Sequence, residues 1–227
     1  MKKILNTIAI AILAVGVSQA QTRLELYNAY ELPYPTINIE GKGAVTTLGS
    51  GDTAGYVAAY WWSPNGTDYS VIGISGFLDM EFGSTAAGCF SFTSDLIIPV
   101  PETGSEISYL GLTVFRFDDL VGADVEDWMA FFNDMKVTSL DDDANAATIA
   151  DMWSAAQNAE DGYARGWWGA EVTINNLGDV APINVFGDGF GWGGDPQYLA
   201  AIPEPSTWLL LGAGAAFLVL MRRRKDS

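Results

Sequence analysis

The sequence predicts a mainly β protein: a β-sandwich or jelly-roll-like domain with one or two short helices packed on it. Short runs that alternate apolar and polar residues, or are rich in β-branched and aromatic residues, recur along the chain, with glycine, proline and asparagine between them. Only two segments, both between residues 117 and 171, repeat their apolar residues at helical spacing. Many short strands joined by turn-forming residues are typical of a sandwich or jelly roll.

The expected strands begin near the N-terminus. Alternation predicts strands at residues 23–27 and 36–40, and the apolar run 55–62 predicts a third, which ends in the turn sequence Ser63-Pro64-Asn65-Gly66. Further strands are expected at residues 71–82, bent at Gly73 and Gly76, and at 90–92, 107–117, 171–175 and 183–186. In the longest of these, Leu110, Leu112 and Val114 lie on one face and Tyr109, Phe115 and Phe117 on the other.

Two helices are expected between residues 117 and 171. Their apolar residues are Val125, Trp128, Met129, Phe132 and Met135 in the first, and Ile149, Met152, Trp153 and Ala156 in the second. Spacing of three to four residues gathers each set on one side of a helix. Each helix is therefore expected to pack that side on the sheet.

Residues 1–20 are typical of a secretory signal peptide. Lys2 and Lys3 supply the positive charge, residues 4–17 are mostly apolar, and Ser18-Gln19-Ala20 places small residues where signal peptidase reads them. Cleavage by signal peptidase is therefore expected between Ala20 and Gln21.

Residues 203–227 form a second terminal signal. Pro203-Glu204-Pro205-Ser206 precedes the apolar segment 208–221, and Arg222, Arg223, Arg224 and Lys225 follow it. As a transmembrane helix the apolar segment would be about 21 Å long, which is short against a bilayer core of about 30 Å. The basic residues stay on the cytoplasmic side by the positive-inside rule. The segment therefore suits a transient stay in the inner membrane better than permanent anchoring.

This tail resembles the PEP-CTERM sorting signal, because a Pro-Glu-Pro triplet, an apolar segment and a basic cluster follow one another within residues 202–227. The resemblance implies a protein exported by a Gram-negative bacterium, processed by the membrane transpeptidase exosortase and destined for the cell surface or the extracellular space. Proteins with this tail are associated with exopolysaccharide and with biofilm or floc formation, and the resemblance extends that expectation to this chain. An uncleaved tail anchor is the alternative.

Between the two signals, residues 21–186 are expected to form the mature domain. Residues 187–202 are rich in glycine and carry two acids, and they contain neither the lysine nor the following helix of a phosphate-binding loop. We expect this segment to be a flexible spacer that holds the Pro-Glu-Pro site away from the domain.

The mature domain is more acidic than the whole chain, which has a formal net charge of −17. Six of the 11 Lys and Arg residues lie in the two terminal signals, whereas 26 of the 28 acids lie between them. Five bases against 26 acids would repel a phosphate backbone, so nucleic-acid binding is not expected.

Histidine is absent, and Cys89 is the single cysteine. This composition excludes Ser-His-Asp and Cys-His catalysis, histidine-ligated zinc and an internal disulfide. No pair of acids stands out as catalytic, and we expect no enzymatic activity. Cys89 lies in an apolar stretch and is expected to be a small buried residue.

Asp141, Asp143 and Asn145 begin like a calcium loop, with oxygen ligands at alternate positions. The rest of the pattern fails, because Ala146 stands where the loop needs glycine and Met152 where it needs glutamate. The alternative is an acidic loop that caps the following helix. No cofactor is expected apart from weakly bound Ca²⁺.

Trp61, Trp62, Trp167 and Trp168 form two aromatic dipeptides. In a strand, one ring of such a pair faces the core and the other faces outward. An exposed ring can stack on the apolar C–H face of a sugar, although burial in the core is the commoner use of tryptophan.

The sequence thus predicts an exported surface or matrix protein associated with exopolysaccharide. A carbohydrate-binding module that uses exposed Trp and Tyr side chains is the first alternative. A secreted glycan hydrolase that uses two of the acids is the second.

Overall fold

A computed structural model describes residues 21–29, 35–77, 87–99, 104–158, 163–175 and 182–200. In chain order its elements are β1 (Gln21–Tyr27), β2 (Ile37–Ile39), β3 (Gly43–Ala44), β4 (Tyr56–Ser63), β5 (Ser70–Gly76), β6 (Ser91–Thr93), β7 (Ile98–Pro99), β8 (Ser105–Arg116), η1 (Asp118–Leu120), α2 (Val125–Asp134), α3 (Ala144–Asn158), β9 (Gly166–Asn175), β10 (Pro182–Phe186), η2 (Gly187–Phe190) and β11 (Gln197–Leu199). The expected mainly β class with two short helices is confirmed.

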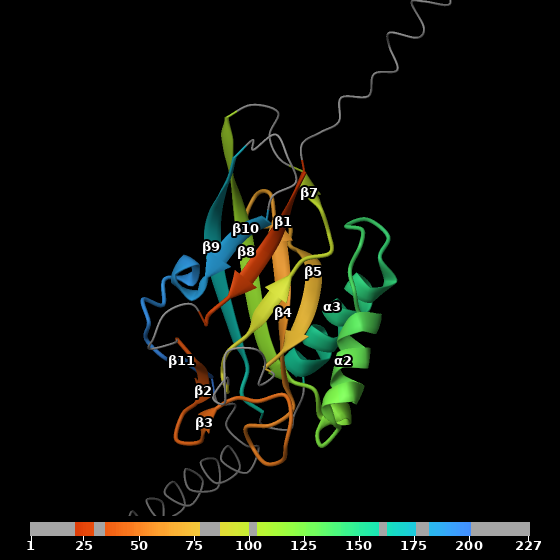
Figure 1. Ribbon diagram of the computed structural model, residues 1–227, viewed down its shortest axis with the longest axis vertical. Helices are drawn as coiled ribbons and strands as arrows, with labels where there is room; N and C mark the ends of the chain where they lie inside the picture. The colour runs from red at the N-terminus through yellow and green to blue at the C-terminus, as the bar shows by residue number, and fades with distance from the viewer. Residues whose placement is uncertain are drawn as a thin grey trace, which may run out of the picture.

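Three sheets make up the described part of the chain. The main sheet is antiparallel, in the order β5-β4-β8-β9. A second sheet has the order β10-β1-β6, and β7 also pairs with β1. The third sheet is small, in the order β11-β2-β3. Helices α2 and α3 lie beside β4 and β5 of the main sheet (Figure 1).

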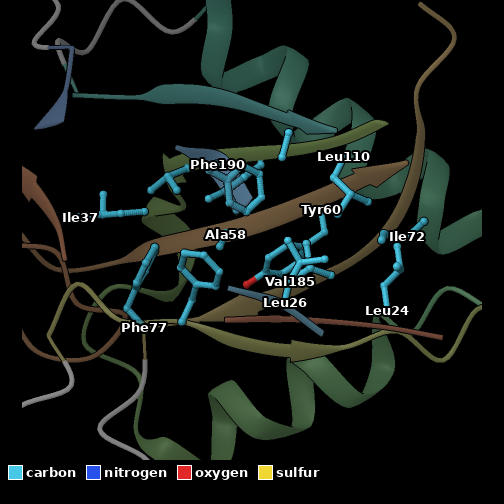
Figure 2. Packing of buried hydrophobic residues seen from close by; sticks show 14 of the residues in the cluster. Leu24, Leu26, Ile37, Ala58, Tyr60, Ile72, Phe77, Leu110, Val185 and Phe190 are labelled. Carbon is cyan, nitrogen blue, oxygen red and sulfur yellow. The ribbon is translucent and has the colours of Figure 1, made fainter. Parts of the chain in front are cut away.

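One hydrophobic core fills the space between the main and second sheets (Figure 2). Leu24 and Leu26 of β1 face Tyr60 of β4 and Leu110 of β8 across this core, and all four side chains are buried. Alternate residues of each strand point to the same face. This is why the apolar positions of β1, β4 and β8 meet in a single layer.

A second core lies between the opposite face of the main sheet and the two helices. Trp128 of α2 is fully buried there and stacks on Phe132, with ring centroids 5.6 Å apart, and Phe115 of β8 contacts Trp153 of α3. Asp124 caps the start of α2, and its side chain accepts a hydrogen bond from the backbone N–H of Asp127 at 2.9 Å. Strand β8 is thus buried on both faces from Leu110 to Phe115, whereas its first residues are exposed.

The two ends of the domain are joined by parallel strand pairs. Strand β1 pairs in parallel with β10, and β2 pairs in parallel with β11. Each pair links residues near the start of the described chain with residues near its end. Residues 1–20 and 201–227 lie outside the described residues, and so do the predicted cleavage residue Ala20 and the whole sorting tail.

The prediction of a flexible spacer over residues 187–202 is wrong for its described part, residues 187–200. Phe190, Trp192 and Leu199 are buried in the core between the sheets, and β11 is a strand of the third sheet. Trp192 contacts the rings of Phe90 and Trp168, at centroid distances of 6.1 and 5.5 Å. The segment is ordered because its aromatic side chains are buried, whatever its glycine content.

The predicted strand boundaries differ from the observed ones mainly at turns and edges. Strand β5 ends at Gly76, and residues 78–82 of the strand expected at 71–82 lie outside the described residues. Strand β9 begins at Gly166, five residues before the predicted start. The two-residue strands β3 and β7 were not predicted, because two residues carry too little pattern to mark a strand, and β11 lies in the segment that was read as a spacer.

Candidate functional site

The helices cover only part of one face of the main sheet. On the uncovered part, alternate residues of β8 and β9 point away from the core between the sheets, in the paired positions Ile107–Thr173, Tyr109–Glu171, Gly111–Gly169 and Thr113–Trp167. Ile107, Trp167, Gly169, Glu171 and Thr173 are exposed. We call this surface, together with the adjoining Tyr69, the open face.

Trp167 is the dominant side chain of the open face, and 45% of its surface is exposed. Its indole lies over Gly111 of the neighbouring strand. A Cβ atom at residue 111 would come within 2.5 Å of Cη2 and 2.9 Å of Cζ2 of this indole. The absence of a side chain at Gly111 therefore lets the ring lie across the sheet.

Two aromatic side chains support the Trp167 ring. Tyr69 meets it edge-on, with centroids 5.3 Å apart at 90°, and Trp61 contacts it at 6.2 Å. Trp61 is itself buried, and its Nε1 donates a hydrogen bond of 3.0 Å to Oγ1 of Thr113. Ring contacts of this kind favour one orientation of Trp167. The open face thus presents an aromatic ring that is held in place before any ligand binds.

The turn between β4 and β5 borders the open face. Oδ1 of Asn65 accepts hydrogen bonds of 2.9 Å from the backbone N–H groups of Thr67 and Asp68, and Nδ2 of Asn65 donates to Oδ2 of Asp68 at 2.7 Å. Gly66 of the same turn packs on the ring of Tyr109. The turn signal in the sequence is therefore confirmed, and this turn fixes Asp68 beside Tyr69.

The four tryptophans predicted as glycan-binding candidates have different environments. Trp61 and Trp62 are buried, with 8% and 7% exposed, and Trp168 is half-buried against Trp192. Trp167 alone among the four is exposed. Strand β4 is central and covered on both faces, whereas β9 is an edge strand with one uncovered face. The sequence pattern missed Tyr69, which contacts the Trp167 ring, and it missed Tyr109 and Glu171, which the β8–β9 register pairs farther along the same face.

Cys89, read from the sequence as a small buried residue, is 5% exposed. Burial raises the pKa of its thiol to about 11. The thiol is therefore protonated at neutral pH, which agrees with a packing role and not with that of a reactive nucleophile.

The loop with Asp141, Asp143 and Asn145 leads into α3. Oδ1 of Asp143 accepts hydrogen bonds from the backbone N–H groups of Asn145 and Ala146, and its Oδ2 accepts from the backbone N–H and the hydroxyl of Thr138. The Asn145 amide donates to the carbonyls of Asp134 and Lys136, at 2.9 and 2.8 Å. Asp143 thus caps the helix, and Asn145 ties the loop to the end of α2.

Calcium binding by this loop stays a prediction. In the part of the chain that the structure describes, no group of three or more His, Cys, Asp or Glu side chains is arranged to hold a metal ion. Hydrogen bonds from Thr138, and from the backbone of Ala146 and Asn145, lower the pKa of Asp143. Each of these donors would compete with a cation for the same carboxylate oxygens.

Replacing Asp143 with alanine is expected to lower the free energy of unfolding by about 1 kcal/mol at pH 7. Because the pKa of Asp143 is lower in the folded protein, this stabilisation is present above the unfolded value of about 3.9 and is lost as the pH falls through the folded-state value. Urea unfolding of wild type and Asp143→Ala should therefore differ at pH 7 and converge in acid.

The control for this prediction is Asp141→Ala, at an exposed position in the same loop. We expect it to change the free energy of unfolding by less than about 0.5 kcal/mol. Calcium and magnesium should then raise the melting temperature of the wild type equally. A calcium-selective rise that disappears in both variants would contradict the capping interpretation and establish a metal site.

Among the described residues, no helix is long and apolar enough to cross a membrane. The predicted membrane segment 208–221 lies outside them.

Comparison with known proteins identifies the tail. Residues 201–225 match the family model of the PEP-CTERM protein-sorting motif. This match includes Pro203, Glu204, Pro205, Ser206 and the arginines 222–224, which the sequence analysis had singled out. No curated protein and no solved structure matches the chain. The sorting motif implies an exported protein that passes through the membrane and is processed by exosortase.

Proposed function

We propose that this protein acts at the cell surface or in the extracellular matrix, where it binds exopolysaccharide through the open face. The observation that carries the proposal is the exposed Trp167 ring, which lies over Gly111 and is supported by Tyr69 and Trp61. An aromatic ring that is both exposed and fixed is suited to stacking on the C–H face of a pyranose ring, because little side-chain entropy is lost on binding.

The shape of the surface around Trp167 supports a long ligand. Gly111 and Gly169 form a pair in the register; the indole covers Gly111, and Gly169 is exposed and carries no side chain. Tyr109 lies beyond this glycine pair on the same face. In this proposal a polysaccharide chain runs from Trp167 past the exposed Gly169 toward Tyr109. The export signal in the tail supports the proposal, because an exported protein can meet secreted polysaccharide.

Alanine in place of Trp167 is expected to weaken retention on exopolysaccharide at least about tenfold, which corresponds to about 1.4 kcal/mol of binding free energy. The measurement is the dissociation constant of the purified protein for polysaccharide from its host. Tyr198→Ala is the matched control, because Tyr198 is an aromatic residue that is 59% exposed on β11, outside the open face.

A second variant tests the geometry of the site with Trp167 retained. Gly111→Ala puts a methyl group where the indole lies, so it should displace the ring and weaken binding to a similar extent. Equal retention of wild type, Trp167→Ala and Gly111→Ala would refute glycan binding at this face. Release of reducing sugar would instead favour the glycan hydrolase.

A further inference from the structure

The open face carries negative charge farther along the strand from its aromatic ring. Glu171 is exposed and stands opposite Tyr109 in the strand register. It follows Trp167 by four residues on the same face of β9, so the two Cα atoms are about 13 Å apart along the strand. Gly169 lies between them. A sugar chain that stacks on Trp167 and crosses the glycine pair therefore reaches the Glu171 carboxylate.

A second carboxylate borders the same surface. Asp68 is exposed, precedes Tyr69 and is held by Asn65. Strands β4, β5 and β9 contain no Lys or Arg, and Arg116 of β8 pairs with Asp118 at 2.8 Å at the far end of its strand. Arg165, two residues before Trp167, donates to the Ala156 carbonyl in the last turn of α3. The charged groups on and beside the open face, Glu171 and Asp68, are thus acidic.

This charge pattern separates the possible classes of glycan. A uronate polymer would meet Glu171, Asp68 and the field of 26 acids against five bases, all of which repel it. A neutral polymer would gain only stacking on Trp167. A polymer with free amino groups would gain stacking and an ion pair with Glu171, and the overall field would speed its approach.

We propose that the open face selects polysaccharides that carry free amino groups, with Trp167 stacking on a sugar ring and Glu171 pairing with an amine farther along the chain. This inference rests on the proposed glycan-binding function. It assigns to Glu171 a specificity role that the sequence pattern alone does not show.

The experiment compares three probes of equal length: glucosamine oligomers with free amines, their fully N-acetylated counterparts, and galacturonate oligomers. Dissociation constants are measured for the full protein at mildly acidic pH, where the glucosamine amines are protonated, at low and high salt. The expected order of affinity is amine, then acetylated, then uronate. Salt should weaken amine binding, because ion pairs at a surface are screened, and should leave acetylated binding nearly unchanged.

Glu171→Gln is expected to weaken amine binding by about twofold to fivefold, the range of one exposed ion pair, and to leave acetylated binding unchanged. Trp167→Ala should weaken both. The matched control is Glu106→Gln. Glu106 is an exposed acid of β8 whose side chain points to the other face of the sheet. It removes the same charge from the domain, and we expect it to leave the dissociation constant for the amine oligomer unchanged.

Three results would overturn the inference. If amine and acetylated oligomers bind equally through Trp167, the amine selection is refuted while the proposed function stands. If Glu106→Gln weakens amine binding as much as Glu171→Gln does, the preference comes from the net charge of the domain and not from this site. If no oligomer binds through Trp167, the proposed function fails as well.

Discussion

A protein that ends at Phe186 is expected to lose its cooperative unfolding transition, whereas a protein that ends at Ala200 is expected to keep it. Residues 187–200 contribute Phe190, Trp192 and Leu199 to the core between the sheets, where they are 9%, 4% and 2% exposed (Figure 2 includes Phe190). They also supply β11, the parallel partner of β2. Loss of one buried aromatic side chain typically costs about 3–5 kcal/mol. A typical domain has only about 5–15 kcal/mol of stability to lose.

Thermal and urea unfolding, followed by near-ultraviolet circular dichroism, distinguish the two truncations. Trp192→Ala provides a milder version of the same test and should lower the free energy of unfolding by about 3–5 kcal/mol. Tyr198→Ala, at an exposed position of β11, should lower it by less than about 1 kcal/mol. Equal unfolding midpoints for the truncations at residues 186 and 200 would restore the interpretation of this segment as a spacer.

Alanine at all three positions Pro203, Glu204 and Pro205 is expected to leave the tail on the protein in its native host. The family model matches residues 201–225, and the described fold ends at Ala200, whose backbone pairs with Arg165. The triplet begins three residues after Ala200 in the sequence. Processing is an all-or-none event for each molecule, so the effect is large.

The intact mass of the triplet variant shows whether Arg222, Arg223 and Arg224 are retained. Asp226→Asn is the control, because Asp226 lies beyond the matched residues 201–225. We expect the control to be processed like the wild type. Normal processing of the triplet variant would mean that these three residues are not the sorting determinant.

The sequence predicted the central strands well because their signal is local. The apolar residues of β8 fall into two sets on opposite faces: the structure buries Leu110, Leu112 and Val114 on one face and Phe115 on the other, whereas Tyr109 is half-buried. Both helices occur where the spacing of Trp128 and Ile149 with their neighbours predicts them. These patterns depend only on residues within one element, so they are readable without knowledge of the partner strands.

The ordered segment after β10 was misread because its order depends on distant partners. Gly191, Gly193 and Gly194 have positive φ angles of 77°, 54° and 85°, which allow the tight turns that bring Trp192 back to the core. The pairing of β11 with β2 joins residues from opposite ends of the mature chain. The glycine content alone therefore suggested a flexible segment. The buried aromatic residues among the glycines instead make the segment part of the core.

The open face was predictable only in part. The two Trp-Trp dipeptides include the exposed Trp167, but the sequence does not say which strand lies at the edge of the sheet. Trp61 and Trp62 are buried because β4 is central, and Trp167 is exposed because β9 is not. Glu171 meets Tyr109 only through the β8–β9 register, which no local pattern specifies.

The intact mass of the protein in the polysaccharide-bound surface fraction of its host tests the proposal of a sorted, glycan-binding surface protein most directly. We predict a chain that begins at or near Gln21, the first residue of β1, and ends near Pro203. The Trp167→Ala variant should be processed to the same mass but should be absent from the polysaccharide-bound fraction. A chain found in the membrane fraction with Arg222 to Lys225 still attached would contradict the proposal and favour a simple tail anchor.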